Sequence, residues 1–506
     1  MSESPAAFRA AGSTPAIARG PAGHAAVAAG SGDAALAAAT VLRTGGNAVD
    51  AALAGTLAAC LSEVVFTSLG GGGFLMIRQP DGEHHLLDFF VDTPGLGGNE
   101  AHDPPVFTPV IVHYPGIDQV FHIGAGSVAV PGALEGLLTA NDSFGRISLA
   151  EIVRPAANLA TSGSVLEPLQ AVVLDLVREI MSLTPECAGL IQTPTGYAQA
   201  GDRLFNPAFA RFLRLTGEGA VTTLSSPPFA GPLLELMRAL SGHITAEDLA
   251  TYSVHIREPL RLARNGFGIA LNAPPAFGGA IVADALARLS PIDGGVESWS
   301  RAVEALAAAT EANRVADIKA GIPHVTEGTT HISVVDADGQ VASMTTSNGS
   351  GSGLLIPGTG IHLNNMLGEE DLNPRGFHVM SPGIRMGSMM APTILSHPDG
   401  SVTGLGTGGS ERIRSALMTT LLRMTDLGCS AAKAVACPRM HAQADGVQLE
   451  PGWDPELPTA LGGPVNIWDE PNLFFGGVHA VTRWSDGSVQ AVGDSRRGGA
   501  TAVVPV

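Results

Sequence analysis

The sequence predicts a mixed α/β (α+β) fold in a single compact domain. Helical patterns dominate from about residue 125 to about residue 320, and residues 31–61 are rich in Ala and Leu. Residues 331–346 instead alternate between apolar and polar side chains, which indicates paired β-strands. The sequence contains no internal repeat, low-complexity tract or Pro/Ser-rich linker, so we expect these elements to share one core.

The composition limits the kinds of partner. The chain has 506 residues, of which 45% are hydrophobic and 15% are charged, so it can build a large interior. Its formal charge of −19 and the lack of a Lys/Arg block argue against nucleic acid or an anionic membrane as a partner. We therefore expect the substrate to be a small molecule or a peptide.

Cysteine usage and hydropathy suggest a location. Cys60, Cys187, Cys429 and Cys437 are sparse and show no C-x-x-C spacing, which argues against a zinc site and a disulfide framework. The first twenty residues lack the apolar core of a secretory signal, and no later run reaches about 18 apolar residues. We expect a soluble, cytoplasmic protein without a membrane partner.

The first elements in order are a helical hairpin and a β-hairpin. The sequence TGGN interrupts residues 31–61, which predicts two helices joined by a glycine turn. In residues 68–90, four glycines precede an apolar run, a Pro-Asp-Gly turn and a second apolar run, the pattern of a β-hairpin. The glycines lack the Gly-Lys-Ser/Thr ending of a P-loop, so we interpret Gly70 to Gly73 as tight backbone packing.

The middle of the chain changes composition twice. Residues 90–125 are rich in Pro, Gly and His, which indicates an irregular surface segment. Ordered structure is expected to resume with GAGSVAVPGALEGLL, residues 124–138, and helical patterns continue to about residue 320.

A second β-hairpin follows at residues 329–348. Asp-Gly at 338–339 is a favoured two-residue turn, and such a turn makes the numbers of facing residues sum to 677. This register pairs Thr329 with Asn348 and places four polar side chains on one face: Thr329, His331, Thr346 and Asn348. A slip of one residue would replace Thr346 and Asn348 by Thr345 and Ser347.

The start of this hairpin has the residues of an N-terminal nucleophile. A threonine hydroxyl needs a base, and the α-amine of the same residue supplies one when the chain is cut just before it. That amine has a reference pKa of about 7.7 to 8.0, so part of it is neutral near pH 7. Gly328 would ease backbone distortion at the cut, which makes Thr329 the candidate nucleophile.

Nine motifs in order along nearly all of the chain resemble the γ-glutamyltransferase family of N-terminal-nucleophile hydrolases. They are GGNAVDAAL (45–53), GGGGF (70–74), SVAVPG (127–132), ITAEDLATY (244–252), PPAFGG (274–279), TTHISVVDADG (329–339), GIHLNN (360–365), MAPTI (390–394) and GTGGS (406–410). The resemblance implies a four-layer αββα sandwich. It also implies self-cleavage into a large subunit, 1–328, and a small subunit, 329–506, which stay together as a heterodimer in one compact domain, possibly within a higher oligomer.

The resemblance also assigns roles to residues. It implies that Thr329 attacks an amide carbonyl, that Thr346 hydrogen-bonds this nucleophile, and that Asn348 contacts the α-amino end of the substrate. Backbone N–H groups of Gly408 and Gly409 would form the oxyanion hole. His331 receives no role, and such a histidine is most often a hydrogen-bonded structural residue. No cofactor or metal is implied, and the acyl acceptor would be water or an amine.

The carboxylate side of the expected site departs from the family. Phe90 stands where members that recognise γ-glutamyl groups carry an arginine for the substrate's α-carboxylate, and a bidentate contact is thereby lost. Gly387 and Ser388 occupy the place of a serine pair that touches the same carboxylate, so one hydroxyl is missing. Arg385 could supply a positive charge from another direction.

The residues expected at the α-amino end of the substrate match the family pattern in part. Met366 stands where the family usually has a glutamine, and Glu369 stands where it has an aspartate near the α-amine. The segment between Asn365 and MAPTI leaves little room for the lid loop of many members, so the site is expected to be open with a more apolar floor.

Three functions remain open at this level. The first is a self-processing acyltransferase or amidohydrolase that cleaves γ-glutamyl or related acyl amides through an acyl-Thr329 ester. The second keeps this chemistry but uses another acyl group, for example a glutaryl or oxamate-like one, and Phe90 favours it. The third is an unprocessed, non-catalytic protein that binds a small molecule. The sequence has no G-x-S-x-G or H-E-x-x-H motif of serine hydrolases or metalloproteases.

Overall fold

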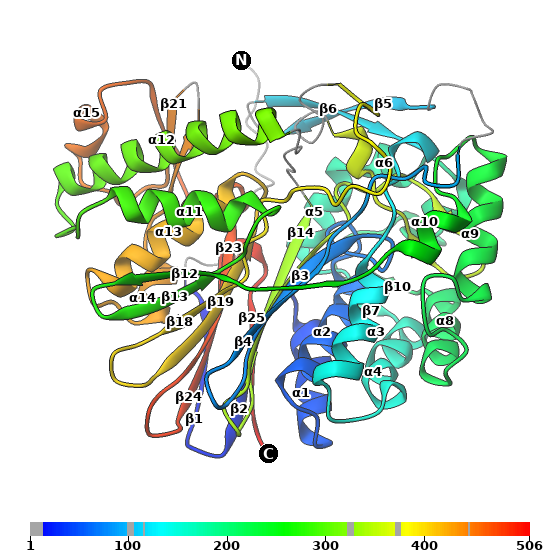
Figure 1. Ribbon diagram of the computed structural model, residues 1–506, viewed down its shortest axis with the longest axis horizontal. Helices are drawn as coiled ribbons and strands as arrows, with labels where there is room; N and C mark the ends of the chain where they lie inside the picture. The colour runs from blue at the N-terminus through cyan, green and yellow to red at the C-terminus, as the bar shows by residue number, and fades with distance from the viewer. Residues whose placement is uncertain (1–13, 99–105, 115–116, 321–327, 370–375, 444–445) are drawn as a thin grey trace.

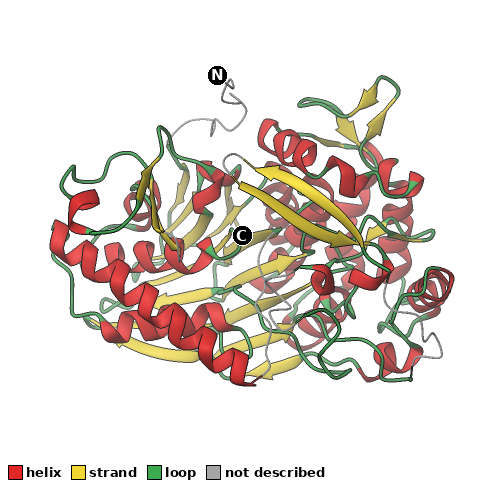
Figure 2. Cartoon of the chain, turned by 90° about the horizontal axis from the view of Figure 1, so that it is seen from above, coloured by secondary structure: helices red, strands yellow, loops and turns green. Residues whose placement is uncertain are grey.

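Two seven-stranded antiparallel sheets lie face to face, and helices cover the outer face of each (Figures 1 and 2). The computed structural model describes residues 14–98, 106–114, 117–320, 328–369, 376–443 and 446–506. The layers run helix, sheet, sheet, helix, so the predicted four-layer αββα sandwich is confirmed.

The sheet that contains the expected nucleophile has the strand order β11-β4-β3-β15-β14-β2-β25. Its central strands β14 and β15 are buried along their whole length, which makes this the most enclosed part of the sheet. The strands, in sheet order, are β11 (His255–Arg257), β4 (His84–Phe89), β3 (Gly72–Arg78), β15 (Val341–Ser347), β14 (Thr329–Val335), β2 (His24–Ala29) and β25 (Ala500–Pro505).

The second sheet has the order β1-β24-β23-β19-β18-β13-β12. Its strand β19 packs across β14 and β15 of the first sheet. The strands, in sheet order, are β1 (Ala16–Gly20), β24 (Val489–Gly493), β23 (Gly477–Arg483), β19 (Val402–Gly408), β18 (Thr393–Ser396), β13 (Phe267–Leu271) and β12 (Leu260–Arg264).

Helices α1 and α2 cover the first sheet, whereas α11 and α13 cover the second (Figure 1). The helices are α1 (Gly32–Arg43), α2 (Ala48–Ser62), α3 (Ala133–Phe144), α4 (Leu149–Ser162), α5 (Pro168–Leu176), α6 (Arg178–Met181), α7 (Pro185–Ala188), α8 (Pro207–Gly217), α9 (Pro227–Ala239), α10 (Ala246–Thr251), α11 (Phe277–Arg288), α12 (Val296–Ala320), α13 (Arg412–Thr425), α14 (Ala431–Ala436) and α15 (Leu457–Ala460).

Short elements lie around the sandwich. They are the strands β5 (Thr108–Tyr114), β6 (Ile117–Ile123), β7 (Ser164–Val165), β8 (Gln192–Thr193), β9 (Gly196–Tyr197), β10 (Arg203–Leu204), β16 (Leu355–Ile356), β17 (Ile361–His362), β20 (Met440–Gln443), β21 (Gly446–Leu449) and β22 (Val465–Ile467), and the 3₁₀ turns η2 (Ala125–Ser127), η3 (Met366–Gly368), η5 (Leu473–Phe475) and η6 (Ser495–Arg497).

Strand β2 shows how one sequence serves two cores. Ala25, Val27 and Ala29 belong to the cluster that packs against α1 and α2. Ala26 and Ala28 belong to the cluster that fills the space between the sheets. Successive side chains of a strand point to opposite faces, so an unbroken small apolar run is what a doubly covered strand requires.

The two early hairpins are confirmed. Helix α1 begins after Ser31, whose hydroxyl accepts from Ala34 N, and α2 begins at a capping box formed by Asn47 and Asp50. Strands β3 and β4 pair around the Pro-Asp-Gly turn. The packing interpretation of the glycines is also confirmed, because a Cβ at Gly71 would lie 2.1 Å from the carbonyl oxygen of Ser347.

The expected irregular segment at residues 90–125 is partly wrong. Residues 108–114 and 117–123 form the antiparallel pair β5 and β6. The side chains of this pair alternate between a buried and an exposed face, as strands require. The buried ones, in a small apolar cluster, are Val110, Val112, Phe121 and Ile123, and the exposed ones are Ile111 and Val120. The Pro and Gly content hid this pattern. Residues 99–105, within the same expectation, lie outside the described residues.

All four cysteines are free thiols. In the part of the chain that the structure describes, every helix is too short or too polar to cross a lipid bilayer.

Candidate active site

The register of β14 and β15 differs by one residue from the prediction. Thr329 pairs with Ser347, and His331 pairs with Thr345. The predicted pairs of Thr329 with Asn348 and of His331 with Thr346 are therefore wrong, and the slipped register is the one that forms. The expectation that Thr329, His331, Thr346 and Asn348 share one face is wrong as well, because the slip puts Thr346 on the side opposite His331.

The turn explains the shift. The hairpin closes with three residues, 337–339, between Asp336 and Gln340, and Gly339 has a φ of +94°. This is the three-residue loop with a left-handed glycine that often follows a type I turn. The Asp336 carboxylate accepts from Gln340 N at 2.9 Å and from Ala48 N of α2 at 3.0 Å, so a contact with the helix layer stabilises the longer loop.

The helix-facing side of the hairpin carries Thr330 and Thr346, which are paired in the register. Thr330 Oγ1 donates to Glu63 Oε2 at 2.6 Å, and Thr346 Oγ1 lies 2.8 Å from Thr67 Oγ1. Burial raises the pKa of Glu63 to about 7, although the hydrogen bond from Thr330 opposes this shift. The role expected for Thr346 at the nucleophile stays a prediction.

The opposite side faces the second sheet, and His331 lies on it. Its Nδ1 is 2.8 Å from Thr345 Oγ1, and its Nε2 is 2.8 Å from Ser333 Oγ. A Cβ at Gly406 of β19 would lie 2.3 Å from the imidazole ring. Burial lowers the pKa of His331 well below its usual value, so the neutral ring is hydrogen-bonded within its own sheet and packs against β19 of the other.

Gly328 and Thr329 stand at the mouth of β14, next to the end of β15. Ser347 Oγ donates to the carbonyl oxygen of Gly328 at 2.5 Å, and Gly349 N donates to Ser347 Oγ at 3.1 Å. Gly328 has a φ of +56°, and a Cβ there would lie 1.7 Å from the carbonyl oxygen of Gly349. Only glycine fits at this position.

Of the two expected oxyanion glycines, Gly408 lies against Thr329. A Cβ at Gly408 would be 2.1 Å from the carbonyl oxygen of Thr329, so β19 approaches β14 as closely as backbones allow. Arg497 Nη1 donates to the same oxygen at 3.1 Å. Gly409, with a φ of +130°, leads from β19 into the turn before α13.

The loop after β15 gathers the residues expected at the amine end of the substrate. Asn365 Oδ1 accepts from Ser350 N at 2.8 Å, and Glu369 Oε1 accepts from the same N–H at 3.3 Å. Asn348 Nδ2 donates to Leu363 O at 3.3 Å, which leaves Asn348 Oδ1 buried without a hydrogen-bond partner among the described residues. A buried acceptor of this kind suits an ammonium group.

Phe90 and Met366 lie in the apolar cluster between the sheets. Phe90 is fully buried, and its ring stacks on Phe74 with centroids 5.8 Å apart. Ser388 is also fully buried, and its Oγ accepts from Met390 N at 3.1 Å. Phe90 and Met366 are therefore in apolar surroundings, and their place at the floor of the site stays a prediction.

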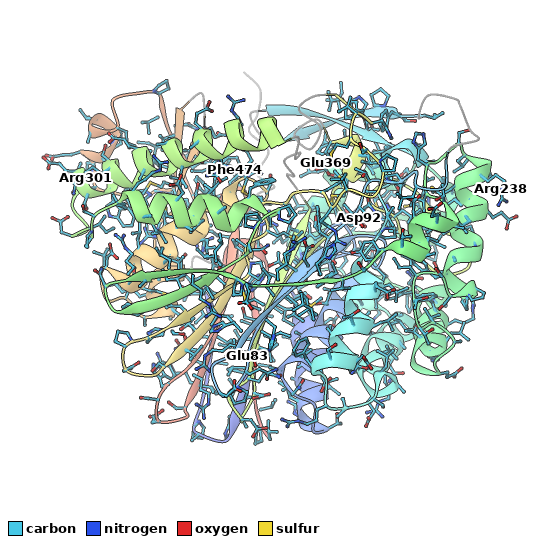
Figure 3. All side chains as sticks on the ribbon, in the orientation of Figure 1. Glu83, Asp92, Arg238, Arg301, Glu369 and Phe474 are labelled. Carbon is cyan, nitrogen blue, oxygen red and sulfur yellow. The ribbon has the colours of Figure 1, made fainter. Side chains whose placement is uncertain are left out.

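Arg385 does not present a spare charge. Its guanidinium pairs with Asp88 at 2.8 Å and with Asp92 at 2.5 Å, and it donates to Ser253 O at 2.8 Å. Arg257 also pairs with Asp88 at 2.7 Å, so two cations and two carboxylates neutralise each other. Asp92 and Glu369 lie toward the upper ends of the central strands, away from Glu83 in the β3–β4 turn (Figure 3).

Three residues near Thr329 escaped the sequence interpretation: Glu63, Ser347 and Arg497. Glu63 follows α2 and Arg497 belongs to η6, so each reaches the site from a remote segment. Of the three, only Ser347 could have been found from the sequence, because a register slip of one residue places it opposite Thr329.

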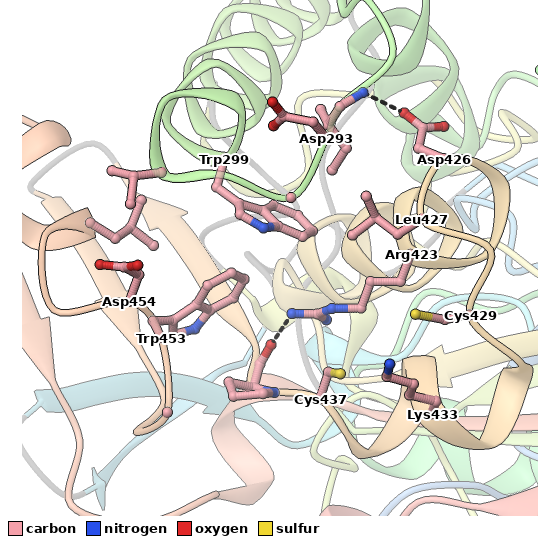
Figure 4. A pocket seen from close by; sticks show the side chains of 16 residues that line it. Asp293, Trp299, Arg423, Asp426, Leu427, Cys429, Lys433, Cys437, Trp453 and Asp454 are labelled. Atoms are coloured by element: carbon pink, nitrogen blue, oxygen red, sulfur yellow. Dashed lines mark hydrogen bonds between the residues drawn. The ribbon is translucent and has the colours of Figure 1, made fainter.

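A pocket of about 610 Å³ lies elsewhere, between the start of α12 and the ends of α13 and α14 (Figure 4). Arg423 lies over the indoles of Trp299 and Trp453, 5.1 Å from each centroid, and its Nη2 donates to Pro438 O at 2.5 Å. None of the residues expected in the active site lines this pocket.

Comparison with known proteins identifies the family of the chain. The model of the γ-glutamyltranspeptidase family matches residues 34–327 and 319–504. The chain is 28% identical to the acylase ACY 1 proenzyme of Pseudomonas sp. (strain SE83), over 89% of this chain and 88% of that protein. It is 27% identical to the glutathione hydrolase proenzyme of Bacillus subtilis (strain 168), over 91% and 88% of the two chains.

A similar fold occurs in the crystal structure of cephalosporin acylase from Bacillus halodurans. The TM-score is 0.80 with 22% sequence identity, and the match covers 96% of each chain.

Proposed function

Because the chain belongs to the γ-glutamyltranspeptidase family, we propose that it is a self-processing enzyme that transfers the acyl group of an amide to water or an amine through Thr329. The observation that carries this proposal is the position of the Gly328–Thr329 bond at the mouth of β14, with Gly408 in contact with the Thr329 backbone. The family and the proenzyme relatives argue against the non-catalytic alternative.

In the proposed cycle, cleavage after Gly328 frees the α-amine of Thr329, which removes the proton of its own hydroxyl. The hydroxyl oxygen attacks the substrate carbonyl, and the amine of the leaving group takes the proton as the C–N bond breaks. N–H groups of Gly408 and Gly409 stabilise the negative oxygen of the intermediate. Water or an amine then attacks the acyl-Thr329 ester and releases the enzyme.

The amine end of the substrate would bind at the loop after β15. The buried Asn348 Oδ1 and the Glu369 carboxylate offer the acceptors that an ammonium group needs. Met366 and Phe90 would supply the apolar floor beside them.

A second candidate keeps this chemistry but uses an acyl group without an α-carboxylate. Phe90 is buried against Phe74, and Arg385 is already paired with Asp88 and Asp92, so neither offers a cation to such a group. A carboxylate is costly to desolvate without a partner.

The mature protein would be a heterodimer of residues 1–328 and 329–506. Strand β14 would then begin the small fragment and lie between β15 of the same fragment and β2 of the large one. The fragments would remain joined through the sheet. The cytoplasmic location stays a prediction.

Two measurements test the proposal. Intact-mass spectrometry of the purified protein should find two fragments that meet at Gly328 and Thr329, the second with a free amino terminus. Turnover on a panel of γ-glutamyl, glutaryl and simple acyl anilides should then identify the acyl group. A single uncut chain with full activity would contradict the proposal.

A further inference from the structure

We propose that the pocket between α12, α13 and α14 is a second ligand site, which binds a small carboxylate that carries an aromatic or other flat apolar group. The pocket has a volume of about 610 Å³, within the range of sites for small organic molecules. Its lining is separate from the residues around Thr329, so the site does not depend on the proposed reaction.

Arg423 is a buried cation that lines this pocket without a counter-charge. It is 4% exposed, and its Nη1 is buried with no hydrogen-bond partner in the part of the chain that the structure describes. Its Nη2 donates to the carbonyl oxygen of Pro438, which is uncharged. A buried charge is costly unless an opposite charge and hydrogen bonds compensate it. A bound anion would supply both.

The neighbouring charges do not compensate Arg423. Arg439 pairs with Asp494, and Arg496 pairs with both Asp494 and Glu450, so these two carboxylates already serve two other cations. The pKa of Arg423 is lowered to about 10, mainly because the group is buried, and Arg439 and Arg496 add to this effect. An anion in the pocket would favour the charged form of Arg423 again.

Three aspartates also line the pocket, but each has another partner. Asp426 pairs with Arg264 at 2.5 Å. Asp293 and Asp454 each accept from the backbone N–H of the residue two positions further along the chain, at 2.9 Å. Their negative charges favour a ligand with a single negative charge over a polyanion such as phosphate.

The remaining walls indicate the body of the ligand. The rings of Trp299 and Trp453 meet edge to face with centroids 5.1 Å apart, and Leu427 adds apolar surface. Lys433 of α14 brings a second cation to the pocket, and it forms no ion pair with the described residues (Figure 4). A flat apolar group can therefore pack beside the indoles while its carboxylate meets Arg423 and Lys433.

Isothermal titration calorimetry of the purified protein tests the site, with phenylacetate as the probe. Phenethyl alcohol is the uncharged control ligand, because it keeps the ring and lacks the carboxylate. We expect saturable binding of phenylacetate and at least about 10-fold weaker binding of phenethyl alcohol, since the hydrogen bonds of a charged group are among the strongest. Inorganic phosphate should also bind more weakly than phenylacetate.

Variants then locate the binding. Arg423→Met should weaken phenylacetate binding by about 10-fold or more, and Arg423→Lys, which keeps the charge, should weaken it less. Arg412→Met is the matched control, because Arg412 belongs to the same helix but lies outside the pocket. Arg412 also lies over an aromatic ring, 4.7 Å from the centroid of Phe474, and donates to a backbone carbonyl.

The exposed Lys433→Glu reverses the second charge and should weaken binding without disturbing the core. Equal affinities for phenylacetate in Arg423→Met and Arg412→Met would overturn the proposal. So would the absence of saturable binding, or binding of phenethyl alcohol or phosphate that is as tight as that of phenylacetate. If the Arg423 variants do not fold, an unchanged affinity in Lys433→Glu would overturn it.

Discussion

The Thr330 hydroxyl donates a 2.6 Å hydrogen bond to the Glu63 carboxyl, on the helix-facing side of the strand that Thr329 begins. Glu63 is 2% exposed, and its Oε1 has no hydrogen-bond partner among the described residues. Gly30 makes room for it, since a Cβ there would lie 2.4 Å from Oε2. Burial of this carboxyl group favours its neutral form, although the hydrogen bond from Thr330 favours the ionised one.

This relationship predicts a pH-dependent stability. The pKa of Glu63 is raised from 4.5 to about 7, so its contribution is present below pH 4.5 and is lost as the pH rises through 7. The loss amounts to about 3 kcal/mol. Glu63→Gln, which can still accept from Thr330, should remove it and make the apparent Tm fall less between pH 5 and pH 8.

The measurement is thermal unfolding at both pH values in an uncut Thr329→Ala background. The exposed Glu83→Gln serves as the control. If Glu63→Gln and Glu83→Gln show the same change of Tm between the two pH values, Glu63 is not the titrating group.

Thr329→Ala should abolish both self-cleavage and turnover, because it removes the nucleophile of each reaction. Thr346→Ala should slow them without stopping them. Thr67→Val is the variant to compare with Thr346→Ala, since it leaves Thr346 intact and removes only the hydroxyl that Thr346 Oγ1 contacts at 2.8 Å. Fragment masses and kcat/KM on an anilide substrate report the result. Wild-type turnover by Thr329→Ala would require another nucleophile.

Specificity should depend on Phe90. We expect γ-glutamyl anilides to be poor substrates, with a high KM, relative to at least one acyl anilide without the α-carboxylate. Phe90→Arg should shift preference toward γ-glutamyl, whereas Phe90→Leu, which adds no charge, should not. The ratio of kcat/KM values for the two substrates decides the matter. A strong γ-glutamyl preference in the wild type would refute the role given to Phe90.

Arg385→Met should act on stability and not on substrate choice. It leaves Asp92 without its partner and Asp88 with only Arg257, and breaking a buried pair in this way costs about 3 to 5 kcal/mol. The apparent Tm should fall, while kcat/KM for γ-glutamyl and other anilides should change by the same factor. A selective loss of γ-glutamyl turnover would show that Arg385 meets the substrate.

Acid should weaken the second sheet through Asp494. Burial alone would raise the pKa of this carboxyl, but Arg439 and Arg496 outweigh burial and lower the pKa to about 2. Its contribution to stability is therefore present above pH 3.8 and is lost as the pH falls through 2. Asp494→Asn should lower the apparent Tm at pH 7 and reduce the difference in Tm between pH 7 and pH 3. An unchanged Tm at pH 7 would contradict this account.

Local sequence was sufficient for several elements. The glycine turn between α1 and α2 and the Pro-Asp-Gly turn of β3 and β4 follow from composition over a few residues. The motif order predicted the layers of the sandwich as well. Residues 108–123 were harder to predict, because the Pro and Gly content of the segment suggested irregular structure. The structure shows that its apolar side chains alternate between a buried and an exposed face.

By itself, then, the sequence determined the four layers, the hairpin and the candidate nucleophile at its mouth. The tertiary structure alone decided the register, because Asp336 bonds to Ala48 of another layer and so selects a three-residue turn over the equally plausible two-residue one. It also brought Ser347 to the Gly328 carbonyl and tied Arg385 to Asp88 and Asp92. Such pairings depend on distances between segments far apart in the chain, and local propensity carries no information about them.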